Sequence, residues 1–139
     1  MNPILRNILA VVAGIIVGNV VNMGIVIFSG EVVSLPEGVT LENVLDNIHL
    51  FQPKHFVMPW LAHAVGTFAG AFVAAKLAAT HKMKFALGIG AWFLFSGSLN
   101  LYLMKGTPLW FTIVDLVGAY LPMGWLGGTL GARGEKDKF

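Results

Sequence analysis

The stretch ILAVVAGIIVGNVVNMGIVIF, from Ile8 to Phe28, decides the class of this chain. It contains no charged side chain, and its length of about 20 residues suits a helix that crosses the hydrocarbon core of a bilayer. Three further apolar stretches follow, at residues 59–79, 85–104 and 109–130. None of the four has the polar face that a helix of a soluble bundle shows at a period of 3.6 residues. We therefore expect one all-α domain, residues 1–139, that is a polytopic membrane protein with four transmembrane helices.

The lysines and arginines gather on one side of these stretches. If the N-terminus is inside, only Lys54 and Lys105 of the nine basic residues lie outside. Because short loops rich in Lys and Arg stay in the cytoplasm, we expect a bacterial cytoplasmic (inner) membrane protein with both termini cytoplasmic. The basic residues on the inner side are Arg6, Lys76, Lys82, Lys84, Arg133, Lys136 and Lys138. No basic stripe interleaves with aromatic residues, so no nucleic-acid partner is expected.

The connection between the first two stretches, residues 29–55, is long and acidic. Thr40 is a residue type that caps helices, and apolar residues then recur at helical spacing. This pattern predicts a short amphipathic helix in the outer loop. Its apolar face would be Leu41, Val44, Leu45 and Ile48, and its polar face Glu42, Asp46 and His49. The polar face is typical of a solvated surface; a metal site is the alternative.

The chain carries a weak internal repeat. The sequence HAVG at 63–66 aligns with DLVG at 115–118, and Asn22 and Asn100 take matching places near the ends of the first and third stretches. The chain could therefore be two similar helical hairpins, related by a pseudo-twofold axis along the membrane normal. The alternative is that small and apolar residues align by chance.

Four polar residues, one from each stretch, fall at a similar depth in the outer leaflet: Asn22, His63, Asn100 and Asp115. An ionisable side chain at that depth is costly against lipid, so it should face the bundle interior or a water-filled cavity. Ser96 lies on the same face of its helix as Asn100. These five residues are our candidate binding site for a small polar solute or ion. Histidine suits such a site because its charge ordinarily changes near neutral pH.

The same positions have a purely structural interpretation. Small residues four apart let transmembrane helices approach closely, and Asn, Ser and His side chains then hydrogen-bond across the contact. The candidate packing residues are Gly14, Gly18, Gly66, Gly70, Gly124 and Gly128. In addition, Pro122 removes a backbone donor from the fourth stretch and is expected to kink it.

Signs of catalysis are few. The chain has no cysteine, and it lacks the G-x-S-x-G, H-E-x-x-H and phosphate-loop motifs. We expect no cofactor, and no metal. The leading expectation is a non-enzymatic protein for small-solute or ion binding or transport, or an accessory subunit of a membrane complex, with a homo-oligomer as a further expectation. The alternative is an outer-leaflet lipid-modifying or hydrolytic enzyme that uses His63 and Asp115 with a serine such as Ser96.

Overall fold

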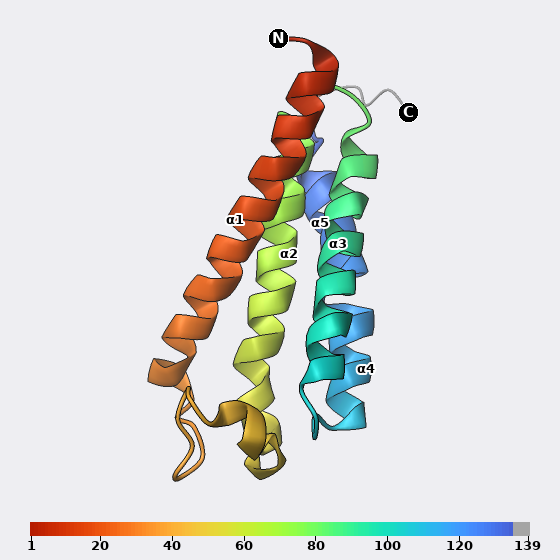
Figure 1. Cartoon of the computed structure of the whole chain (residues 1–139). Helices are drawn as coiled ribbons and strands as arrows, with labels where there is room; N and C mark the ends of the chain where they lie inside the picture. The colour runs from red at the N-terminus through yellow and green to blue at the C-terminus, as the bar shows by residue number, and fades with distance from the viewer. Residues whose placement is uncertain (135–139) are drawn as a thin grey trace.

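The computed structural model describes residues 1–134, whose regular elements are all helices, with no strand among them. Four helical segments in this part of the chain are long and apolar enough to cross a membrane, so the prediction of an all-α chain with four helices of this kind is confirmed. Figure 1 shows them side by side. The α-helices are α1 (Pro3–Val32), α2 (Val57–Leu77), α3 (Lys82–Leu103), α4 (Leu109–Gly118) and α5 (Leu121–Gly131), and the 3-10 helices are η1 (Val44–Leu50) and η2 (Pro53–Phe56).

Helix α2 is the centre of the bundle. It packs against α1 on one side and against α3 and α5 on the other, whereas α1 has few contacts with α3. Figure 1 shows α1 leaning away from α3 toward the end that carries residues 33–56 and 104–108, which we call the loop end. We call the opposite end, where α1 begins and α2 connects to α3, the N-terminal end.

Glycines set the distance between α1 and α2. A Cβ atom on Gly14 would lie 2.7 Å from the carbonyl oxygen of Gly70, and one on Gly70 would lie 2.6 Å from that of Gly14. One turn further along, Gly18 and Gly66 meet in the same way. Distances of 2.6 and 2.7 Å are shorter than the Cβ contacts found in proteins, so the backbones of α1 and α2 are in direct contact where Gly14 and Gly70 cross.

Helix α5 fits between α2 and α3 by the same means. Gly124 faces Gly90 of α3, where an added Cβ would lie 3.2 Å from the Gly90 Cα. Gly128 faces Ala86, also on α3. Gly127, on the other side of α5, lies against the carbonyl oxygen of Phe68 on α2.

Polar contacts tie the helices together at the N-terminal end. Arg6 donates from Nε to the carbonyl oxygen of Leu77 at 2.7 Å. Lys82 is only 3% exposed, and its Nζ donates to the carbonyl oxygens of Ala75 at 3.0 Å and Ala78 at 2.8 Å. Lysine is a favourable residue for the unpaired carbonyls at the end of a helix. Lys82 is therefore a buried cap of α2, and not an exposed basic anchor like Lys84.

The fourth apolar stretch is more strongly bent than expected. We predicted one helix over 109–130 with a kink at Pro122, but α4 ends at Gly118 and α5 begins at Leu121. Pro122 has no N–H, so the carbonyl oxygen of Gly118 cannot receive the hydrogen bond of a continuous helix. Tyr120, at the break, has φ −112° and ψ −73°, which turns the chain between the two helices.

The long connection also differs from the prediction. Its helix, η1, is a 3-10 helix that is interrupted at Asn47. Leu41 lies outside η1, and Ile48 is buried whereas Leu41 and Leu45 are exposed, so the four apolar residues do not form one face of an α-helix. Asn43 accepts from the backbone N–H of Thr40 at 2.8 Å, and Asn47 donates to the Asn43 carbonyl at 2.9 Å. Such local side-chain bonds compete with a regular α-helix.

Helix α1 is longer at both ends than the predicted 8–28. Asn2 accepts a hydrogen bond from the backbone N–H of Ile4 at 2.8 Å, which caps the helix before the predicted start. Pro3 follows at the first helical position, where its missing N–H costs nothing. At the other end the helix continues to Val32, so the connection to α2 is shorter than the predicted 29–55.

Candidate functional site

The site is built around a carboxylate that has no contact with solvent. Asp115, near the end of α4, is 0% exposed. Its Oδ1 lies 2.7 Å from Nδ1 of His63, on the second turn of α2. The His63 side chain keeps 28% of its surface exposed. The structure therefore places the two ionisable side chains of the predicted cluster in direct contact, with the imidazole between the carboxylate and open space.

Tyr120 completes this contact and was not anticipated from the sequence. Its hydroxyl donates to Oδ2 of Asp115 at 3.1 Å. Its ring also stacks on His63, with the ring centroids 5.7 Å apart and the planes 26° from parallel. In a continuous helix, residues 115 and 120 would point in different directions, but the break before Pro122 turns Tyr120 back toward Asp115. Both carboxylate oxygens are thus occupied by side chains of the protein.

Gly97 of α3 leaves the space for this tyrosine. A Cβ atom at position 97 would overlap the Tyr120 hydroxyl. In the sequence, Gly97 is only a small residue on the polar face of its helix. Its position in the structure shows that α3 contributes to the site through an absent side chain as well as through polar ones.

A small polar cavity lies beside His63, between α1, α2 and α3. Its volume is about 80 Å³. Four of the five predicted site residues line it, namely Asn22, His63, Ser96 and Asn100, and so does Tyr120. Asp115 does not line it, because His63 and Tyr120 stand between the carboxylate and this space. We refer to it as the polar cavity.

Two side chains of the polar cavity differ in their hydrogen bonding. The Oδ1 atom of Asn22 is buried and has no hydrogen-bond partner within residues 1–134. Ser96, by contrast, donates from Oγ to the carbonyl oxygen of Trp92 in its own helix at 3.0 Å. The serine hydroxyl is therefore directed to its backbone, while the amide oxygen of Asn22 is left for another donor.

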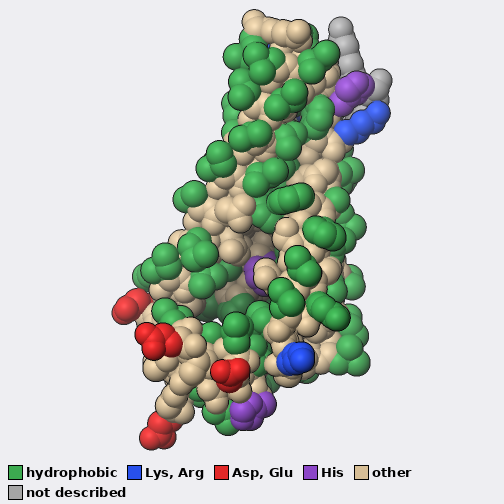
Figure 2. All heavy atoms as spheres, viewed as in Figure 1, with side chains coloured by type: hydrophobic (Ala, Val, Ile, Leu, Met, Phe, Trp, Pro, Cys, Tyr) green, Lys and Arg blue, Asp and Glu red, His purple; other side chains and the backbone are tan. Residues whose placement is uncertain are grey.

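A second cavity lies toward the loop end, and we call it the vestibule. Its volume is about 270 Å³, and it shares His63, Gly97 and Asn100 with the polar cavity. Its walls are mostly apolar and include Ile48, Phe56 and Phe111, which also pack against one another. Figure 2 shows a hollow in the middle of this face of the molecule with a histidine inside it. The shared residues make His63 and Asn100 the boundary between the two spaces.

The charges around the site are unbalanced. No lysine or arginine is among the residues that line the polar cavity or the vestibule. In Figure 2 the visible acidic side chains gather at the loop end. In residues 1–134, no three His, Asp or Glu side chains form a group that could hold a metal ion. Glu42, Asp46 and His49 therefore do not form the metal site that the sequence left open as an alternative.

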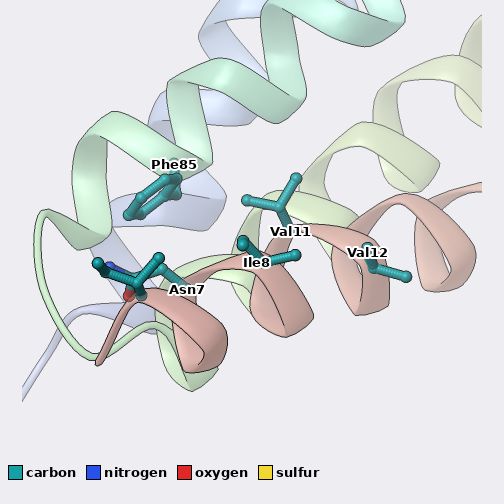
Figure 3. A pocket seen from close by; sticks show the side chains of 6 residues that line it. Asn7, Ile8, Val11, Val12 and Phe85 are labelled. Atoms are coloured by element: carbon teal, nitrogen blue, oxygen red, sulfur yellow. The ribbon is translucent and has the colours of Figure 1, made fainter. Parts of the chain in front are cut away.

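Larger hollows elsewhere have little polar character. One groove of about 430 Å³ runs between the start of α1 and α3, lined by Ile8, Val11 and Phe85 among others (Figure 3). Asn7 is its polar side chain. However, its Oδ1 already accepts from the N–H of Ala79 at 2.8 Å, and its Nδ2 donates to Thr80. The groove therefore offers an apolar contact only, such as a lipid chain would make.

Comparisons with known proteins add no assignment, since no family model, no curated protein and no solved structure matches this chain. The chemistry of the site itself is therefore the basis for a functional assignment.

Proposed function

We propose that this chain is a multi-pass protein of the bacterial cytoplasmic membrane, with both termini in the cytoplasm, and that its bundle binds or transports a small polar solute or ion. The observation that carries the proposal is the fully buried carboxylate of Asp115, which is linked through His63 to the polar cavity. The proposed role is non-enzymatic, because the hydroxyl of Ser96, the serine of the enzymatic alternative, donates to the backbone of its own helix.

The outer surface of the bundle supports membrane insertion. Helix α1 exposes large apolar side chains along its whole length, including Ile4, Ile16 and Ile27, and similar side chains are exposed on the other helices. A soluble monomer rarely exposes a continuous apolar surface of this extent. A bilayer would cover it, and the excess of basic residues near the N-terminal end would then set the orientation.

The unsatisfied features of the site favour binding over packing alone. A buried polar atom without a partner is costly, and native cores pair nearly all such atoms. Here the Asn22 amide oxygen is unpaired next to a cavity large enough for small polar guests. A cluster that served only to join helices would not need this cavity, nor a vestibule that leads to it.

The broken fourth span is a further argument. Discontinuous helices in membranes are tolerated where the freed backbone lies in protein or lines a cavity, and in transporters they form binding sites near the repeat interface. The break between α4 and α5 lies directly beside Asp115 and Tyr120. The pair of similar hairpins, in which His63 and Asp115 align, remains part of the proposal.

The proposal can be tested with the purified full-length protein in lipid nanodiscs. Its thermal unfolding would be measured with a panel of monovalent cations, small amines, small amides and monocarboxylates, in parallel with Asp115→Asn. A ligand that binds only the folded protein raises its stability, so at least one class should raise the melting temperature of the wild type and not that of the variant. A panel without any effect on the wild type would reject the proposal.

A further inference from the structure

The side chains that line the polar cavity include hydrogen-bond acceptors with no donor in residues 1–134. The first is Oδ1 of Asn22, which is buried and unpaired within residues 1–134. The second is Nε2 of His63. When Asp115 is ionised, Nδ1 of a neutral imidazole carries the proton that the carboxylate accepts, which leaves the lone pair on Nε2. A ligand that fits these atoms must supply at least two hydrogen-bond donors.

The charge of the site favours a ligand of positive charge. Asp115 contributes one negative charge when ionised, and no lysine or arginine lines either cavity to balance it. Its two oxygens accept from His63 and Tyr120, so its field acts on the cavity through the imidazole. A cation in the polar cavity would gain from this charge in surroundings of low dielectric constant.

The approach to the site has the same sign. The loop end carries four carboxylates, Glu31, Glu37, Glu42 and Asp46, against two lysines, Lys54 and Lys105. A surface with an excess of one charge raises the local concentration of ions of the opposite charge. The vestibule, which lies at this end, would therefore be supplied with cations.

The polar cavity is large enough for a small cation. Its volume of about 80 Å³ is several times the roughly 10–15 Å³ that a cavity needs to hold one water molecule. An ammonium or methylammonium ion fits this space.

Resting on the binding function already proposed, we infer that the ligand of this site is a small cation that carries N–H donors, of the ammonium and methylammonium class. It donates to Asn22 Oδ1 and His63 Nε2 and lies within the field of Asp115. Alkali cations of similar size fit less well, because hard cations prefer several oxygen ligands and both Asp115 oxygens are already taken by side chains.

The test uses the full-length protein in nanodiscs at constant ionic strength. Binding would be measured by thermal shift and calorimetry with the chlorides of ammonium, methylammonium, potassium and tetramethylammonium, and with acetamide as a neutral donor. Ammonium and methylammonium should raise the melting temperature. Potassium and tetramethylammonium, which have no N–H groups, should not.

Variants of α1 test where the cation lies. Asn22→Leu removes the unpaired acceptor, and ammonium affinity should fall about tenfold or more, as for the loss of a hydrogen bond to a charged group. Met23→Leu is the control on the same helix, since it places the same side chain one residue further along, and Met23 is exposed and lines neither cavity. If Asn22→Leu does not fold, Asn22→Asp decides, because an added negative acceptor should strengthen ammonium binding.

The outcomes separate this inference from the function on which it rests. Equal stabilisation by potassium, or stabilisation by acetamide alone, overturns the N–H cation and leaves a solute site in place. Ammonium binding that is unchanged in both Asn22 variants overturns the placement in the polar cavity. If no solute of either panel changes the melting temperature, both the binding function and the N–H cation are overturned.

Discussion

Gly97 of α3 lies directly against the hydroxyl of Tyr120, so closely that a Cβ atom at position 97 would overlap it. That hydroxyl is the donor to Oδ2 of Asp115 at 3.1 Å. The carboxylate on α4 therefore depends on a missing side chain on a different helix. This dependence can be tested without touching any polar residue of the site.

Gly97→Ala should displace the Tyr120 ring and break its hydrogen bond to Asp115. Overpacking of a close contact costs about 1–3 kcal/mol, and we expect a loss of this size in the free energy of unfolding. It would be measured by denaturant titration of the purified protein in mixed micelles. Gly88→Ala is the control on the same helix, since nothing lies within 4 Å of a Cβ there. Equal effects of the two substitutions would contradict the contact.

The two tyrosines of the chain form a matched pair for the hydrogen bond itself. Tyr120→Phe removes the donor to a buried carboxylate, whereas Tyr102 is 81% exposed. We expect Tyr120→Phe to lower stability by about 1 kcal/mol, within the range for interhelical hydrogen bonds in membranes, and Tyr102→Phe to change it little. Thermal unfolding in the same detergent measures both. A Tyr120→Phe protein as stable as the wild type would show that this bond contributes nothing.

The crossing of α1 and α2 predicts a larger effect. In Gly70→Ala the new Cβ would lie 2.6 Å from the backbone carbonyl of Gly14, and a backbone cannot rotate away as a side chain can. We expect α1 to separate from α2 and the unfolding free energy to fall by about 2 kcal/mol or more. Gly24→Ala, with nothing within 4 Å, should be neutral or slightly stabilising, since alanine favours the helix. Unfolding in denaturant compares the two; equal stabilities would argue against the close crossing.

The proposed orientation can be measured because the chain has no cysteine of its own. Lys54 and Lys84 are both exposed, one at each end of the bundle. A membrane-impermeant maleimide should label Lys54→Cys in intact cells, and Lys84→Cys only after the cells are opened. The reverse pattern would invert the topology, and labelling of both in intact cells would argue against a fixed orientation.

Much of this architecture could be predicted from the sequence, because length and hydropathy identify long apolar helices with little help from tertiary contacts. The shared depth of Asn22, His63 and Asn100 followed from the same reasoning, and these residues do line one cavity. Depth alone could not say that Asp115 lies behind His63 and outside the cavity lining, since this depends on the rotation of α4 about its axis.

The contacts that the sequence did not predict depend on places where a helix is interrupted. Tyr120 reaches Asp115 because the helix stops at Gly118, and a regular helix of period 3.6 would have separated them. The signal was present in Pro122, which we treated as a kink within one helix. Likewise, a 3-10 helix stands where the sequence predicted an amphipathic α-helix. The side chains of Asn43 and Asn47 form hydrogen bonds with the nearby backbone there, and a pattern of apolar residues does not reveal such bonds.

The role of Pro122 can be separated from simple helix stability with a double-mutant cycle. Pro122→Ala restores an N–H that can bond to the Gly118 carbonyl, so α4 and α5 should join into a more regular helix. Tyr120 would then turn away from Asp115, and the hydroxyl would no longer contribute. We therefore expect Tyr120→Phe to cost about 1 kcal/mol in the wild type but much less in the Pro122→Ala background, with the unfolding free energies of all four proteins giving the coupling.

An equal cost of Tyr120→Phe in both backgrounds would mean that the proline does not position the tyrosine. The control is Pro108→Ala, since Pro108 precedes α4 and its replacement should leave the break between α4 and α5 unchanged. In that background the cost of Tyr120→Phe should stay at its wild-type value, because the turn between Gly118 and Leu121 is what aims the hydroxyl at the carboxylate.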